Sequence, residues 1–223
     1  MVSIEDLRGL KDEVEGCFKH LHRIPELGFE ERETGAFIAE KLKAYGFDSV
    51  RTGVGGTGVI ADIVTDPKAK TLMLRADMDC LPLQEVTGLE YASLTDGRMH
   101  ACGHDAHVSM LLGAANYLSS HRSGLRGNVR FVFQPAEEGP IPGGAVKLIE
   151  EGVLNGVSAC LTAHVSPLLP VGQVMLQSRE AMASTDKFMI LINGRGGHGA
   201  MPQAAIDPTP ALSELLAAIN LLP

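Results

Sequence analysis

One stretch of the sequence, HACGHDAHVSM beginning at His100, holds three histidines, one cysteine and one aspartate within eleven residues. Cys102 and His104 flank Gly103, and a glycine between them lets both side chains turn toward one point. A thiolate and an imidazole suit zinc and similar borderline metals. We therefore predict that Cys102 and His104 bind metal. His100 or His107 alone is better explained as a cap or a hydrogen-bonded polar residue.

Further candidate ligands follow the ends of three predicted strands. Asp77 and Asp79 close the segment TLMLRADMD, Glu137 and Glu138 follow VRFVFQPA, and His164 follows ACLTA. One pair of acids in isolation is usually solvated charge. Several such groups at strand ends are harder to explain by coincidence, because the carboxyl ends of parallel strands meet at one edge of a sheet. The sequence therefore predicts a single site at that edge.

The adjacent glutamates Glu137 and Glu138 can divide two tasks between them. Neighbouring side chains of an extended segment point to different sides, so one carboxylate can ligate a metal while the other holds a water beside it. A metal lowers the pKa of its bound water toward neutrality, and the second carboxylate can take the proton as the hydroxide attacks a carbonyl. This pattern predicts hydrolytic chemistry.

The elements that must position these residues alternate along the chain. Apolar spacing predicts helices over 3–21, 31–47, 105–121 and 144–154, and strands over 57–64, 71–79, 127–139 and 157–165. Such alternation predicts an α/β fold with a mostly parallel sheet and helices on both faces.

The pattern of apolar residues and glycines in the sequence changes near residue 180. A strand with a glycine-rich exit is predicted over 184–203 and a helix over 210–220. One strand and one helix cannot bury both of their faces alone. We therefore interpret 1–180 as a metal-binding catalytic domain and 181–223 as the beginning of a smaller α/β domain.

The glycine pattern TGVGGTG, with Gly53, Gly55 and Gly58, could be mistaken for a dinucleotide-binding loop. A dinucleotide-binding loop opens a helix whose N-terminus holds the pyrophosphate. Here the strand-like segment VIADIV follows instead, so we interpret the glycines as a turn.

Composition limits the partners and the compartment. The chain has 223 residues, 45% of them hydrophobic, and a formal charge of -8 without a run of Lys or Arg, which argues against a nucleic-acid partner. No apolar run approaches membrane-spanning length, and the N-terminus lacks a basic start and an apolar stretch, so we expect a cytoplasmic protein without a membrane partner. Four scattered cysteines suit buried or ligating thiols better than disulfides.

Six segments, taken together and in order, resemble the binuclear metal-dependent amidohydrolases that include hippurate hydrolase, the indole-acetyl-amino-acid hydrolases and N-acyl-amino-acid deacetylases. They are LHRIPELGFEE, RADMDCLP, MHACGHDAHVSMLLGAA, FQPAEEG, AHVSPLLPVG and GRGGHGAMPQAAIDP, and they span nearly the whole chain. The resemblance implies two divalent metal ions, with ligands that match Cys102, His104, Glu138 and His164.

The same resemblance implies roles for three more residues. Glu137 matches the general base, and Asp79 matches an acid that supports the metal site. His198, in GGHGAMP, matches a residue of a lid or dimerisation domain that helps to polarise the scissile carbonyl, often across a dimer. From the sequence alone, a polar residue in a glycine-rich turn explains His198 equally well.

The implied reaction is hydrolysis of the amide bond of a small N-acyl amino acid or short peptide, by a homodimer formed through the lid. Two alternatives stay open: a dipeptidase of the same architecture, which recognises a free amino terminus, and a metal-binding protein without catalysis. The cysteine favours zinc, whereas the carboxylates leave manganese, cobalt or nickel open.

Members of this family are longer, and a segment after their lid supplies a further metal-binding histidine that no residue here matches. Removing one ligand from a two-metal site weakens one metal much more than the other. We therefore expect this polypeptide alone to be poorly active and to bind only part of the metal complement.

Overall fold

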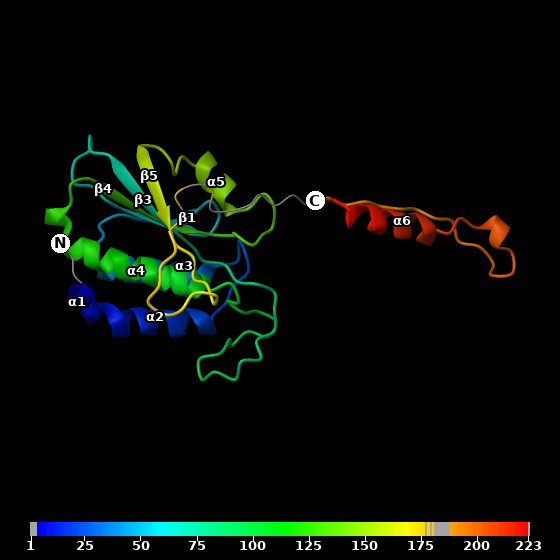
Figure 1. Cartoon of the computed structure of the whole chain (residues 1–223). Helices are drawn as coiled ribbons and strands as arrows, with labels where there is room; N and C mark the ends of the chain where they lie inside the picture. The colour runs from blue at the N-terminus through cyan, green and yellow to red at the C-terminus, as the bar shows by residue number, and fades with distance from the viewer. Residues whose placement is uncertain (1–3, 177, 179, 181–187, 223) are drawn as a thin grey trace. The chain divides into compact units, whose positions relative to one another are not determined.

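The computed structural model describes residues 4–176, 178, 180 and 188–222. By its internal contacts the chain divides into a unit Met1–Leu169 and a unit Pro170–Pro223, and each is described by itself below. The first unit is a five-stranded sheet with helices on both faces (Figure 1). This arrangement confirms the α/β class.

The strands of the first unit form a mixed sheet in the order β1-β2-β4-β3-β5. β3 runs parallel to β4 and β5, whereas β2 runs antiparallel to β1 and β4. Their bounds are Val50–Val54 (β1), Gly58–Ile63 (β2), Thr71–Asp77 (β3), Asn128–Gln134 (β4) and Val157–Thr162 (β5).

The mixed sheet differs from the mostly parallel one expected from the sequence. Two parallel strands need a connection of a dozen or more residues, usually a helix, and residues 64–70 between β2 and β3 are too few and hold no helix. β2 therefore runs opposite to β3 and to the strand β4 that lies between them. β1 is an additional strand, and the glycine pattern connects it to β2 as a tight antiparallel hairpin, with φ of +65° at Gly55 and +116° at Gly56. The interpretation of these glycines as a turn is confirmed.

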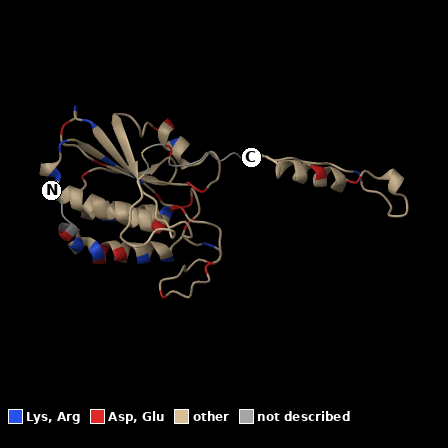
Figure 2. Cartoon of the chain, viewed as in Figure 1, with Lys and Arg blue, Asp and Glu red and all other residues tan. Residues whose placement is uncertain are grey.

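The helices of this unit correspond to those expected from the sequence. α1 and α2 are separated by a 3₁₀ turn at Arg8–Leu10, and α2 carries both basic and acidic residues along its length (Figure 2). The bounds are Ile4–Leu7 (α1), Lys11–Arg23 (α2), Arg32–Ala44 (α3), His104–Ser120 (α4) and Gly144–Glu150 (α5). None of the helices in the described part of the chain is long and apolar enough to cross a membrane.

The core lies on both sides of β4. Phe131 and Phe133 point to the face that α2, α3 and α4 cover, and Val132 between them points to the face that α5 covers. Side chains alternate between the two faces of a strand, so this strand is buried on both sides. The first cluster includes Leu21 of α2 and Leu112 of α4, both almost fully buried.

The second unit is smaller. It contains α6 (Thr209–Ile219), a 3₁₀ helix (Pro202–Ala204) and an isolated bridge between Arg195 and Ile206. α6 confirms the predicted helix, and Glu214 is its one charged residue (Figure 2).

The predicted strand over 184–203 does not form in residues 188–203, and residues 184–187 lie outside the described part of the chain. A strand needs a hydrogen-bonded neighbour, and within residues 188–203 the bridge at Arg195 is the one pairing. The proposed division between 1–180 and 181–223 stays a prediction.

Candidate metal centre

The carboxyl ends of three strands bring the predicted ligands together. Asp77 at the end of β3 lies opposite Gln134 of β4, and Arg75 lies opposite Thr162 of β5, so all three strands end at one edge. The chain leaves that edge through Asp79, Glu137 and His164. α4 begins at His104 and packs against β3, which adds the cysteine and histidine of the CGH turn.

His104 lies at the centre of three groups of potential ligands. Each group has one ligand atom per residue, and the atoms of a group lie within 4.8 Å of one another. The groups are Cys102 with His104 and His164, His104 with Glu137 and Glu138, and Asp77 with His104 and His107. The first two contain all the residues that the sequence identified as ligands or base.

The His104 ring is oriented for ligation. Its Nδ1 lies 2.9 Å from the backbone oxygen of Asp79, so the Nδ1 proton is donated there and Nε2 keeps its lone pair. Metal-binding histidines characteristically donate their other ring N–H to a carboxylate or a backbone carbonyl. Nε2 is buried and has no hydrogen-bond partner among the described residues, although Glu137 Oε2 lies 3.8 Å away and Glu138 Oε1 3.9 Å away. Asp77 Oδ1 also lies 3.8 Å from this nitrogen. A buried, unpaired nitrogen facing three carboxylates fits a divalent cation.

Cys102 and His164 complete one side of this cluster. The Cys102 Sγ lies 3.4 Å from His164 Nε2, and His164 Nδ1 donates to the backbone oxygen of Val165 at 2.6 Å. The thiol therefore donates to a lone pair that points into the site. Burial, together with the charge of Glu138, raises the pKa of Cys102 to about 12. A metal that binds this sulfur must displace its proton.

Gly103 is required at the turn that presents Cys102 and His104. Its φ is +88°, in the left-handed region, and it forms the N-cap of α4. A Cβ at this position would lie 2.5 Å from a methyl carbon of Val165. The glycine therefore allows both the turn and the close approach of the segment that carries His164.

His107 supports the site instead of facing it. Its Nδ1 donates to Asp77 Oδ1 at 2.6 Å, and its Nε2 accepts the backbone N–H of Val165 at 3.0 Å. Both ring nitrogens are occupied, so the interpretation of His107 as a hydrogen-bonded polar residue agrees with the structure. Asp77 is also held by Arg75, whose guanidinium donates to Oδ2 at 3.0 Å. The partners of Asp77 keep its pKa far below the usual range despite its burial.

Glu137 is the more exposed of the adjacent glutamates, with 42% of its side chain accessible against 28% for Glu138. Burial, and then the negative charges of Glu138 and Asp77, raise the pKa of Glu137. A carboxyl group with a raised pKa is a better proton acceptor near neutral pH. Asp79, which is fully buried, accepts the backbone N–H of Glu138 at 2.9 Å, so it fixes the backbone next to Glu137.

Residues 73–218 match the family described as peptidase family M20/M25/M40. The chain belongs to this family. It is 44% identical to the N-acetyl-L-cysteine deacetylase of Bacillus subtilis over 96% of this chain and 51% of that protein. It is 46% identical to the Arabidopsis thaliana protein named IAA-amino acid hydrolase ILR1-like 5, over 92% of this chain and 46% of that one.

The solved structures agree with the family assignment. The Bacillus subtilis YXEP protein, described as a dinuclear metal binding peptidase from the M20 family, is 43% identical and superposes with a TM-score of 0.69. The superposition covers 74% of this chain and 45% of that protein. This chain spans about half the length of the curated relatives it matches.

Two further histidines of this M20 chain, His198 and His100, belong to none of the candidate ligand groups found among the described residues. His198 is exposed in the second unit, where its Nδ1 accepts the backbone N–H of Ala200 at 3.1 Å, and its role stays a prediction. His100 is buried, and neither of its ring nitrogens has a hydrogen-bond partner among the described residues. Burial lowers the pKa of His100 to about 4, so the ring is neutral at physiological pH.

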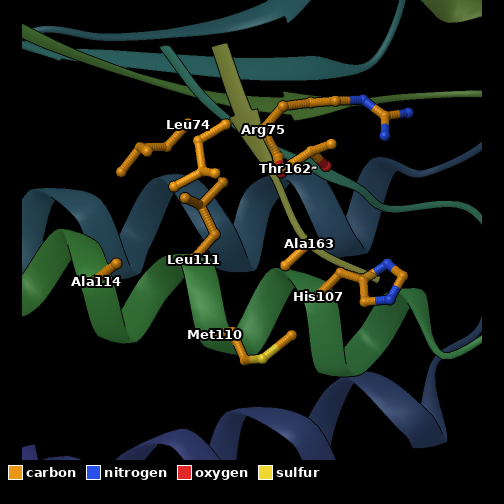
Figure 3. Close-up of a pocket in the computed structure, with 9 residues that line it drawn as sticks. Leu74, Arg75, His107, Met110, Leu111, Ala114, Thr162 and Ala163 are labelled. Carbon is orange, nitrogen blue, oxygen red and sulfur yellow. Dashed lines mark hydrogen bonds between the residues drawn. The ribbon is translucent and has the colours of Figure 1, made fainter. Parts of the chain in front are cut away.

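An apolar pocket borders the centre but does not contain it. The pocket lies between α4 and the strands β3 and β5, lined by Leu74, Leu111 and neighbouring residues, and His107 lies at one end of it (Figure 3). Its polar members, Arg75, His107 and Thr162, all use their side chains in hydrogen bonds to Gln134, Asp77 or the backbone. The buried Nε2 of His104, which has no hydrogen-bond partner among the described residues, does not line this pocket.

The structure adds two acids that sequence reasoning missed. Glu31 is fully buried and accepts the backbone N–H of Ala136, next to Glu137. Glu85 contacts His22, whose ring also lies 2.6 Å from Asp105. The signal for the first was present in the segment LHRIPELGFEE, because an acid just before a predicted helix start is a candidate cap or binding group.

Proposed function

We propose that this chain carries the metal-binding part of a hydrolase that cleaves the amide bond of N-acyl amino acids. The observation that carries the proposal is the buried, unpaired Nε2 of His104, which faces Glu137 and Glu138. The family membership and the names of the relatives, a deacetylase of an N-acetylated amino acid and a hydrolase of amino acid conjugates, support the amide as the bond that is cut.

Cys102, His104, Glu138 and His164 would hold two divalent metal ions. A thiolate, two imidazoles and a carboxylate suit zinc, and manganese, cobalt or nickel are compatible with the carboxylates. When bound, such metals polarise a carbonyl oxygen and lower the pKa of water. The neighbour described as dinuclear supports a pair of ions.

Glu137 is the proton carrier in this proposal. Its carboxylate takes a proton from the attacking water as the water oxygen bonds to the amide carbon, and it passes that proton to the nitrogen as the carbon–nitrogen bond breaks. The products are a carboxylate and an amino acid. The raised pKa of Glu137 suits both transfers, because the group can be charged before the first and protonated before the second.

Asp79 and His198 have separate tasks in the proposal. Asp79 does not touch the substrate but holds the backbone of Glu138. His198 would donate to the amide oxygen as negative charge develops there. We further propose a homodimer formed through residues 181–223 and action in the cytoplasm.

The test is hydrolysis by the protein loaded with zinc or with manganese. The substrate panel holds N-acetylcysteine, hippurate and an indole-acetyl amino acid, with unacylated dipeptides beside them. Glu137→Gln is compared with Glu150→Gln, which changes an exposed glutamate at the end of α5. We expect slow cleavage of acylated substrates, because this chain lacks one of the family's metal-binding histidines, together with loss of that turnover in Glu137→Gln at unchanged metal content and wild-type turnover in Glu150→Gln.

Two results would overturn the proposal. Cleavage of dipeptides with a free amino terminus, but not of acylated amino acids, indicates a dipeptidase. Metal uptake without hydrolysis of any substrate, and with no difference between the wild type and Glu137→Gln, indicates a metal-binding protein without catalysis.

A further inference from the structure

Two buried carboxylates bind the backbone on either side of Glu137. Glu31 Oε1 accepts the N–H of Ala136 at 2.8 Å, and Asp79 Oδ2 accepts the N–H of Glu138 at 2.9 Å. Both acids are 0% exposed. The peptide group between Pro135 and Ala136 and the one between Glu137 and Glu138 are therefore each held by a carboxylate from a distant part of the chain.

The backbone at Ala136 needs such support. Its φ is +47°, and among the described residues only Phe29 shares a positive φ without being a glycine. A left-handed conformation is unfavourable for a residue with a Cβ and persists only where the surrounding structure imposes it. Ala136 immediately precedes Glu137, so this conformation sets the direction in which the glutamate leaves β4.

The position of Glu31 is itself fixed by two further contacts. Its Oε2 accepts the hydroxyl proton of Thr57 at 2.5 Å. Glu31 stands at the N-cap position of α3, but its side chain does not cap the helix. The carboxylate of Glu26 caps it instead, accepting the backbone N–H groups of Arg32, Glu33 and Thr34 at 2.8 to 3.1 Å. The backbone oxygen of Glu31 accepts the N–H of Gly35 within α3.

The segment before Glu31 also packs directly against the segment after Ala136. A Cβ on Gly28 would lie 1.8 Å from the backbone oxygen of Gly139 and 2.9 Å from the Cα of Ala136. The ammonium of Lys147 lies 3.9 Å from the centre of the Phe29 ring, which joins the same segment to α5. Residues 28–31 thus pack closely against residues 136–139.

We propose that Glu31 is a positioning residue that aims the carboxylate of Glu137. Glu31 acts through the N–H of Ala136 and touches neither the substrate nor the metal ligands. The inference rests on the proposed function in one respect, that Glu137 is the base. The contact between Glu31 and Ala136 and its effect on the backbone do not depend on that role.

The test compares Glu31→Ala, Glu31→Gln and Thr57→Val with Glu40→Ala, which removes an exposed glutamate from the same helix. Glu31→Gln keeps an oxygen that can accept the Ala136 N–H, so it should restore what Glu31→Ala loses. Thr57→Val keeps the charge of Glu31 but removes its second contact, so a smaller loss is expected. Thermal unfolding first establishes that each variant is folded.

Three measurements are made on the folded variants. For Glu31→Ala we expect kcat to fall roughly tenfold or more, the scale on which mispositioning of a reacting group acts. We expect KM and bound metal to change by less than a factor of about two, because ligands and substrate contacts are untouched. Amide hydrogen exchange of residues 136–139 should accelerate in Glu31→Ala and stay slow in Glu31→Gln and Glu40→Ala.

An unchanged kcat with unchanged exchange in a folded Glu31→Ala protein overturns the inference. So does loss of metal in parallel with activity, because Glu31 would then maintain the ligands and not the base. If the wild type hydrolyses no acylated amino acid, the proposed function fails, and the exchange measurement still decides whether Glu31 holds the backbone at Ala136.

Discussion

His107 accepts the backbone N–H of Val165 at 3.0 Å, across the gap between α4 and the end of β5. Through its other nitrogen the same ring donates to Asp77 at the end of β3. One histidine therefore connects two strand ends and fixes the residue next to His164. The candidate ligand His164 is therefore positioned by a histidine that we did not assign as a ligand.

Replacing His107 should weaken metal binding without removing a ligand. His107→Phe keeps a ring in the buried site but breaks both hydrogen bonds, so the backbone beside His164 loses its anchor. We expect the affinity for Zn²⁺ to fall by roughly 10- to 100-fold, as is typical when a group that orients a ligand is removed. Competition with a chromophoric chelator measures this. His121→Phe, at the exposed end of α4, is the control. An affinity within about twofold of wild type would contradict the role of His107.

Gly103 offers a paired test of backbone conformation and close approach. Gly97 has a similar φ, +72° against +88°, but no atom lies within 4 Å of a Cβ placed there. Both Ala substitutions should cost about 1 to 2 kcal/mol for the left-handed conformation. Gly103→Ala should cost more, because its Cβ meets Val165. Urea unfolding of the metal-free proteins measures the difference. Adding Val165→Ala should recover the excess, and equal losses at both glycines would refute the contact.

His22 predicts a pH dependence of stability. Its Nδ1 lies 2.6 Å from Asp105 and its Nε2 3.2 Å from Glu85, and the side chain is 7% exposed. The hydrogen bond to Asp105 raises the pKa of His22, outweighing the effect of burial. Its charged form is therefore favoured in the folded state. The resulting stability is present below the unfolded pKa of about 6.5 and is lost as the pH rises through the higher folded pKa.

Stability measured against pH with His22→Gln tests this sign. The variant should be less stable than the wild type by about 2 kcal/mol at pH 6, because buried hydrogen bonds to charged groups are lost. The difference should shrink as the pH rises above the folded pKa. His20→Gln, an exposed neighbour in α2, controls for loss of a histidine. A difference that grows from pH 6 to 9 would show the opposite linkage. Chelator is kept in all samples so that metal binding does not contribute.

The places of the candidate ligands could be predicted from the sequence because strand ends in a parallel arrangement converge. Cys102, His104, Glu137, Glu138 and His164 all lie near the edge where β3, β4 and β5 end. The sequence pattern also predicted every helix of the first unit, since apolar spacing and terminal glycines such as Gly46 are local signals. The directions of the strands were harder to predict from the sequence, because the pairing of β2 with β4 joins residues far apart in the chain.

The contacts of Glu31 and His22 could not be predicted, because they also join residues far apart in the chain. Glu31 contacts a residue 105 positions away and His22 one 83 positions away, and nothing local in the sequence marks either partner. From the sequence, a carboxylate next to a helix start is expected to cap that helix. In this structure Glu26 caps α3, and Glu31 instead accepts the backbone N–H of Ala136. Only the tertiary contacts separate the two roles.

The metal content of Cys102→Ala tests the central claim most directly. The wild type, Cys102→Ala and Cys160→Ala are loaded with Zn²⁺, dialysed and analysed for bound metal by mass spectrometry. Cys160, exposed on β5, belongs to none of the three ligand groups of the described residues. We predict that Cys102→Ala loses bound metal relative to the wild type while Cys160→Ala keeps it. Full metal content in Cys102→Ala would contradict the assignment of the centre.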